Sequence, residues 1–329
     1  MAETVPPENV ALHRFAVATA VATLGLIVAG GLVTSTESGL SVPDWPLSYG
    51  RLMPPMVGGV FYEHGHRMVA TTVGILTVVL AIWLVRREPR RWVRSLGLLA
   101  VAAVVAQGVL GGLTVIFLLP TAVSVAHACL AQTFFCLTVA IAVVTSPRWK
   151  PGEGNRSAGT GPTDLHPPPY SERLPRLAAW TASAVFLQLA IGAVMRHTKA
   201  GLSIPDFPLS LGRVVPPLDS FPVAIAFAHR AWALAVAGLV FATVSAAFSA
   251  GNRRTGLFLG ALVLAQIALG ALTVLSRKNV AITTAHVATG ALLLGTSVAL
   301  SFGSSRLKSL SRRSRSERRG AVSILASEP

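Results

Sequence analysis

The strongest constraint on this chain is a series of long stretches that contain no Asp, Glu, Lys or Arg. They cover residues 15–33, 68–85, 95–146, 177–195, 231–252, 255–276 and 279–305. A membrane-spanning helix needs about 20 mostly apolar residues, so 95–146 is long enough for two helices with a break at Pro120. With the segments that carry His66 and His229 added in front of their spans, the stretches predict eight helices. We therefore expect an all-α membrane protein, in agreement with a hydrophobic content of 52%.

Basic residues are concentrated between alternate spans and after the last one. They cluster in 86–94, 148–176, 253–254 and 306–319. This positive-inside pattern predicts that both termini are cytoplasmic, and it accounts for the net charge of +15 without nucleic acid as a partner. The first ten residues are acidic and contain proline, unlike a transit or signal peptide. The expected location is the bacterial cytoplasmic membrane, as a multi-pass protein in the lipid bilayer.

The chain contains an internal repeat. Residues 39–48, GLSVPDWPLS, recur at 201–210 as GLSIPDFPLS, and further matches follow in step. The predicted organisation is a first four-helix repeat (1–146), a cytoplasmic linker (147–175), a second four-helix repeat (176–305) and a basic cytoplasmic tail (306–329). Because each repeat holds an even number of spans, both enter the membrane in the same direction. The two bundles are therefore expected to be related by a pseudo-twofold axis along the membrane normal.

Four histidines fall at corresponding places in the two repeats. They are His66, His127, His229 and His286, each about 9–13 Å below the outer surface at 1.5 Å per helical residue. A single buried histidine is commonly a packing residue, but an ionisable side chain at this depth usually marks a functional site. Four at one level favour ligands.

Two imidazoles per bundle are too few for a zinc site but suit the axial positions of a heme iron. The pairs predicted to hold heme iron are His66 with His127 and His229 with His286. Arg67 and Arg230 directly follow two of these histidines and are candidates for binding heme propionates. The alternative is that both arginines anchor the helices at the lipid headgroups.

One carboxylate breaks the repeat. Glu63 lies three residues before His66 and therefore on the same helix face, whereas the matching position in the second repeat is Ala226. A carboxylate beside heme could relay protons or orient a substrate. It could also be a helix N-terminal charge favoured by the macrodipole. The asymmetry favours a catalytic role for Glu63.

The segment Glu63-His64-Gly65-His66-Arg67 resembles the Glu-x-x-His-Arg signature of heme A synthases, and the eight spans and later histidine pairs are similar too. The resemblance implies an oxidoreductase that converts the C8 methyl group of heme O to the formyl group of heme A by successive hydroxylations and loss of water, for terminal oxidase biogenesis. It also implies heme b on His229 and His286, heme O near His66 and His127, and an essential Glu63. Relatives often carry a cysteine pair in the first outer loop, which this chain lacks.

Other classes of function remain open at this stage. A diheme electron-transfer protein resembling cytochrome b561 would use the histidines but would need neither the repeated loop nor Glu63. A transporter or heme chaperone would be suggested by the repeats alone. The resemblance implies a heme O synthase as a partner, whereas the electron donor and a homo-oligomeric state cannot be read from the sequence.

Overall fold

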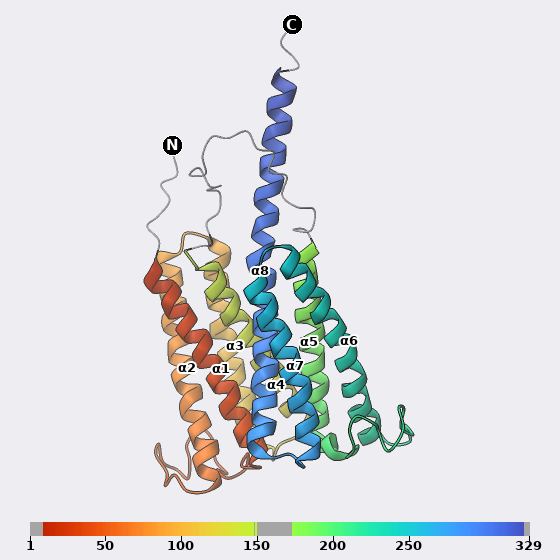
Figure 1. The fold of residues 1–329 in the computed structure, drawn as a ribbon. Coiled ribbons are helices and arrows are strands. Elements are labelled where there is room, and N and C mark those ends of the chain that lie inside the picture. The colour runs from red at the N-terminus through yellow and green to blue at the C-terminus, as the bar shows by residue number, and fades with distance from the viewer. Residues whose placement is uncertain (1–8, 148, 150–172, 326–329) are drawn as a thin grey trace.

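The computed structural model describes residues 9–147, 149 and 173–325, and the side chains up to Ser304. Within these residues the chain is helical and contains no β-strand (Figure 1). The helices are α1 (Val10–Ser35), α2 (Gly59–Arg87), α3 (Arg91–Ile116), α4 (Thr121–Val144), α5 (Arg173–His197), α6 (Phe221–Ser249), α7 (Arg253–Leu275) and α8 (Val280–Leu325), with a short 3-10 helix, η2 (Ala200–Leu202).

Eight of the described helices are long and apolar enough to cross a membrane, and in α8 this applies to Val280–Ser304. The expected all-α chain with eight such helices is thereby confirmed. The break at Pro120 is confirmed as well, because Pro120 caps the N-terminus of α4 and follows Leu118 and Leu119, both with positive φ. The α7–α8 connection repeats this pattern with Arg277 and Lys278.

Helices α1–α4 pack in one group and α5–α8 in another, and each group has its own apolar core. The first core includes Val73, Leu84 and Phe134, and the second includes Val240 and Leu259. Because lipid is as apolar as these side chains, close packing and hydrogen bonds hold such helices together. The two cores therefore behave as separate packing units within one membrane protein.

The two groups meet where α1 and α4 contact α5 and α8. The ring of Phe135 on α4 packs against Gly295 on α8, so closely that a Cβ at this glycine would lie 2.8 Å from the ring. Arg196, in the last turn of α5, donates to the Gly31 carbonyl oxygen at 3.1 Å and to the Ser35 hydroxyl at 2.7 Å, both on α1. The contact of Phe135 with Gly295 and the hydrogen bonds of Arg196 thus join the two groups.

Two helices extend beyond the apolar stretches that predict them. Helix α8 does not end with its apolar stretch but continues to Leu325, through most of the predicted 306–329 tail (Figure 1). Helix α5 begins at Arg173, before the predicted linker ends, because the first turn of a helix tolerates Pro175. Most of the 147–175 linker lies outside the described residues.

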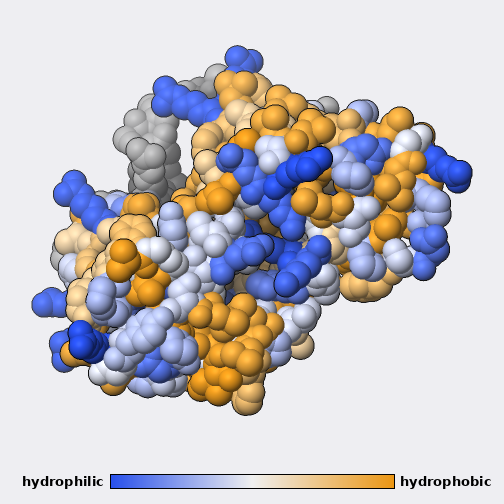
Figure 2. Space-filling model, turned by 90° about the horizontal axis from the view of Figure 1, so that it is seen from below, coloured by the Kyte–Doolittle hydropathy of each residue, from blue (hydrophilic) through white to orange (hydrophobic). Residues whose placement is uncertain are grey.

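The two long loops, 36–58 and 198–220, lie at the end of the helices opposite to the start of α1 (Figure 1). Seen from this end, hydrophilic side chains gather near the middle of the face, with apolar side chains around them (Figure 2). Leu52 and Val214, one from each loop, are the most exposed large apolar residues of the loops. The four histidines of interest lie in the second or third turn of α2, α4, α6 and α8, near this end.

Candidate functional site

The structure places two of the four predicted histidines in each group of four helices. His66 lies on α2 and His127 on α4, whereas His229 lies on α6 and His286 on α8. Each pair belongs to one group of four helices. The assignment of each pair to one heme iron remains a prediction.

A glycine on the preceding helix faces each imidazole. A Cβ built on the glycine would lie 3.0–3.2 Å from the histidine Cε1 atom. The pairs are Gly30 with His66, Gly111 with His127, Gly192 with His229 and Gly270 with His286. Any larger residue would push the imidazole aside, so the glycines keep room for the ring and for a flat group beside it.

Glutamine side chains contact three of the histidines. Gln107 Nε2 lies 3.3 Å from His127 Nε2 and donates to the His127 carbonyl oxygen at 3.0 Å. Gln188 Nε2 lies 3.2 Å from both ring nitrogens of His229 and donates to its carbonyl oxygen at 2.9 Å. Gln266 Nε2 lies 3.3 Å from His286 Nε2. These amides tie the histidine-bearing helices to their neighbours.

The donor set fits heme. Among the described residues, no three His, Cys, Asp or Glu side chains cluster as a protein-only metal site would require. The Nδ1 atoms of His66, His127 and His286 are buried without a hydrogen-bond partner. Two imidazoles in each group of four helices, in apolar surroundings and with a glycine beside each ring, would suit a porphyrin iron, which needs only two protein ligands.

The same arrangement of hydrogen bonds to an aspartate shapes both long loops. In the first loop, Ser48 and Arg51 pair through their backbones around a turn in which Tyr49 and Gly50 have positive φ. Both amides of this turn donate to the carboxylate of Asp44, at 2.6 and 2.8 Å. Asp206 accepts from Leu211 and Gly212 in the second loop, at 2.8 Å each. Asp44 and Asp206 therefore shape their loops.

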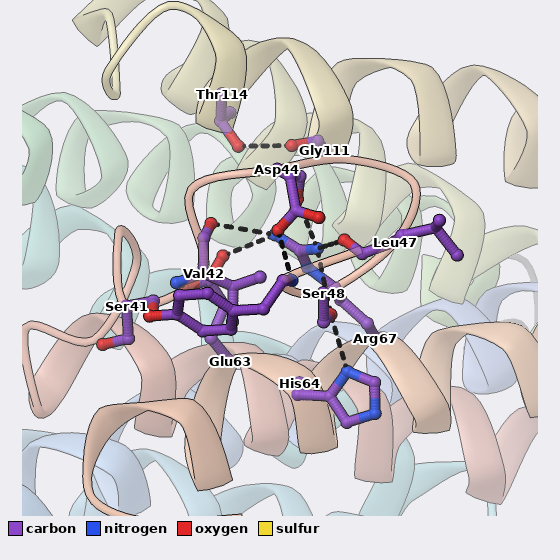
Figure 3. Close-up of polar contacts among 11 residues, drawn as sticks. Ser41, Val42, Asp44, Leu47, Ser48, Glu63, His64, Arg67, Gly111 and Thr114 are labelled. Carbon is purple, nitrogen blue, oxygen red and sulfur yellow. Dashed lines mark hydrogen bonds and ion pairs between the residues drawn. The ribbon is translucent and has the colours of Figure 1, made fainter. Parts of the chain in front are cut away.

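The guanidinium groups of Arg67 on α2 and Arg230 on α6 donate hydrogen bonds to backbone carbonyl groups of these loops. Arg67 Nη1 donates to the carbonyl oxygens of Asp44 at 2.8 Å and Leu47 at 2.9 Å (Figure 3). Arg230 Nη1 donates to those of Asp206 and Leu209 at the same two distances. Propionate binding, predicted from the sequence for both arginines, remains a prediction, and the structure adds a second role in loop attachment.

Glu63 lies between the first long loop and α2. Its side chain is 5% exposed, and its Oε1 atom accepts from Arg67 Nη2 at 2.8 Å (Figure 3). Its Oε2 atom accepts from the Val42 amide at 2.8 Å. Ala226, in the same place on α6, is also buried but offers no polar atom. A buried carboxylate is costly unless it is paired, so its presence in one repeat only requires a specific reason.

Trp45 shows how the first loop covers the helix ends. A Cβ on Gly112 of α3 would lie 2.6 Å from the Trp45 ring, so the indole rests directly on this glycine. The glycine is the neighbour of Gly111, which faces His127. The loop that Glu63 and Arg67 hold therefore reaches the helix that borders the first histidine pair.

With this geometry established, comparison with known proteins identifies the family. The model of the cytochrome oxidase assembly protein family (COX15-CtaA) matches residues 13–59 and 56–298. The chain belongs to this family. The matched part of the chain includes both long loops and all four histidines.

Several relatives of this chain are heme A synthases. The heme A synthase of Symbiobacterium thermophilum is 32% identical over 276 residues, which cover 82% of this chain and 87% of the relative. That of Beijerinckia indica is 30% identical over 333 residues, covering 83% and 87%. That of Halalkalibacterium halodurans is 30% identical over 230 residues, covering 67% and 72%.

Two polar contacts near the histidines were missed by sequence reasoning. His64 Nδ1 and the Ser48 hydroxyl lie 2.8 Å apart, which joins α2 to the first loop beside Arg67 (Figure 3). The other contact is that of Gln188 with His229. Its signal is present in the sequence, because Gln188 precedes Gly192 by four residues, as Gln107 precedes Gly111.

The stability of the turn in the first long loop should depend on pH. Hydrogen bonds from the Gly50 and Tyr49 amides hold the pKa of Asp44 below its usual value of 3.8. A lowered pKa means that the ionised carboxylate stabilises the turn above about pH 4 and that this contribution is lost as the pH falls through the lowered pKa. Hydrogen exchange at Tyr49 and Gly50, corrected for intrinsic rates, should show constant protection from about pH 7 to 4 and loss below.

Asp44→Asn is the control for this prediction, because an amide keeps the shape but does not titrate in this range. Its protection should be lower and should show no acid step. A wild-type profile identical to that of Asp44→Asn would contradict the role assigned to the carboxylate.

Proposed function

We propose that this chain is a heme A synthase that oxidises the C8 methyl group of heme O to a formyl group by successive hydroxylations and loss of water. Membership of the family and the printed names of its relatives support this function. The observation that carries it is the buried carboxylate of Glu63, present in one of two otherwise similar histidine sites. A diheme electron-transfer protein would need the histidines alone.

In this proposal the two repeats divide the work. His66 and His127 bind the substrate heme, with Arg67 beside it, and His229 and His286 bind a resident heme b, with Arg230 beside it. The support is the presence of two histidines in each group of four helices and the glycine that faces each ring. When bound, heme b supplies a one-electron carrier to the second repeat.

Glu63 is the proposed catalytic residue. Its position three residues before His66 on α2 puts it on the helix face that carries the substrate ligand. Its two oxygens are held by the Val42 amide and by Arg67, so the carboxylate is fixed in position before substrate binds. A fixed carboxylate can accept or deliver a proton at its oxygen atoms during the oxidation.

We further propose a multi-pass protein of the bacterial cytoplasmic membrane with both termini in the cytoplasm. The basic clusters between alternate helices support this orientation. The long loops and the histidine pairs then lie towards the outer side, and a pseudo-twofold axis relates α1–α4 to α5–α8. A heme O synthase is the proposed source of substrate, the electron donor is a separate component, and assembly into a homo-oligomer is compatible with this arrangement.

The function is tested by expression of the chain in a bacterium that makes heme O but no heme A. Hemes are extracted from its membranes and separated by chromatography. Heme A should form only in air and only when the chain is present. If heme O persists unchanged while the chain is folded and loaded with heme, the proposed function is wrong.

A further inference from the structure

The contacts around the four histidines follow one pattern with one exception. Each histidine faces a glycine on the preceding helix, and in three cases a glutamine four residues before that glycine contacts the histidine. Four residues before Gly30, the position that corresponds to Gln188 in the second repeat is Leu26. His66 therefore has the glycine but not the glutamine.

The glutamine contact restrains the histidine in two ways. The amide of Gln188 donates to the backbone carbonyl of His229, which links α5 to α6 at the level of the ligand. The same amide nitrogen also lies within 3.2 Å of the imidazole nitrogens. The amide can only donate, so it restrains the ring as a packing neighbour and fixes the residue through its backbone carbonyl; loss of such an outer contact typically costs 10- to 100-fold in metal affinity.

His66 lacks this restraint. Leu26 is an apolar, partly buried residue that packs against the core of α1–α4 and offers no hydrogen bond. The imidazole of His66 contacts Gly30 on α1, and Leu26 occupies the position that holds a glutamine at the other three histidines. His127, the other member of the pair, is held by Gln107. The two ligands of the first repeat thus differ in how firmly they are held.

We propose that Leu26 makes His66 the exchangeable ligand of the substrate heme, whereas Gln107, Gln188 and Gln266 hold the other three histidines as permanent ligands. This inference rests on the proposed function, and it gives the glutamines a positioning role. A site that releases a modified heme needs one ligand that dissociates readily. When His66 dissociates, it frees the side of the heme that faces α2, the helix that carries Glu63.

Carbon monoxide measures this difference directly. It binds ferrous heme with two histidine ligands only after one of them dissociates, so at saturating carbon monoxide the rate of binding reports ligand release. The purified full-length protein with both sites loaded should show a fast phase from the first repeat and a slow phase from the second. Leu26→Gln should slow the fast phase by about 10- to 100-fold.

Gln188→Leu tests the same proposal from the opposite direction and introduces no buried polar group. It should speed the slow phase by about 10- to 100-fold and leave the fast phase unchanged. Leu26→Met is the matched control, since it changes the packing volume little and adds no amide, and it should keep both wild-type rates.

Equal slow rates at both hemes of the wild-type protein, or a fast phase that Leu26→Gln does not change, would overturn the inference. Heme A formation measured on the same preparations separates this outcome from failure of the proposed function. If heme A forms while the carbon monoxide phases do not respond, only the inference on Leu26 fails. If the phases respond but no heme A forms, the ligand assignment stands and the synthase function fails.

Discussion

Replacement of Glu63 with alanine is expected to abolish heme A formation while the protein keeps its bound heme. Loss of a positioned acid–base group typically lowers a rate by about 10²- to 10⁴-fold. Heme binding should survive because the paired histidines and their facing glycines do not depend on the carboxylate. The measurement is the ratio of heme A to heme O in extracts of the purified variant and the wild type.

The second repeat indicates that this variant should fold. Arg230 holds the second loop through the carbonyl oxygens of Asp206, Leu209 and Ile204, with alanine at position 226. Loop attachment therefore does not require a carboxylate at this position. Glu63→Gln is a more conservative test, because the amide keeps the hydrogen bond from Val42 but neither pairs ionically with Arg67 nor titrates as a carboxyl group does.

Glu88 provides a matched control for Glu63. It is the other buried glutamate among the described residues and pairs with Arg90 at 2.6 Å, between α2 and α3 and away from the histidines. Glu88→Ala should lower stability but leave the heme A to heme O ratio at the wild-type value. If Glu63→Ala and Glu88→Ala both retain wild-type ratios, Glu63 has no catalytic role.

Loss of His229 is expected to remove the resident heme and leave the substrate site able to bind. An axial ligand contributes directly to iron affinity, so His229→Ala should weaken heme binding by more than the 10- to 100-fold typical of outer contacts. His66→Ala should instead lower the content of heme O and heme A and spare heme b. Pyridine hemochrome spectra combined with chromatography of the extracted hemes distinguish the two results.

His13 is the control histidine. Its Nδ1 atom lies 3.0 Å from the Ala142 carbonyl oxygen near the start of α1, far along the helices from the paired histidines. His13→Ala should keep all heme types at wild-type levels. If His229→Ala and His66→Ala lost the same heme to the same extent, the division of the two sites between the repeats would be contradicted.

The eight helices could be predicted from the sequence because the membrane imposes a strong condition on length and charge. The charge-free stretch 95–146 is long enough for two membrane-spanning helices separated at Pro120. The structure has a helix on each side of this residue. Helix ends outside the membrane follow other rules. Helix α8 continues to Leu325 because arginine and leucine are good helix formers, which hydropathy does not measure.

The histidine positions were predictable from the repeat, whereas most of their surroundings were not. Depth along a helix follows from counting residues, but contacts such as Arg196 with Ser35 depend on how α5 packs against α1. The pairing of His64 with Ser48 depends on the path of the first loop. The path of this loop cannot be predicted from the sequence, because it depends on the turn at Tyr49 and Gly50 and on the hydrogen bonds from Arg67.

In the proposed function, the second repeat keeps its heme b, and the first repeat oxidises the heme O that it receives. The most direct measurement is the heme composition of the purified wild-type protein, extracted and separated by chromatography after expression together with a heme O synthase. We expect heme b together with heme O and heme A in the wild-type protein, and no heme A in Glu63→Ala. Two equivalents of heme b, with neither heme O nor heme A, would contradict it.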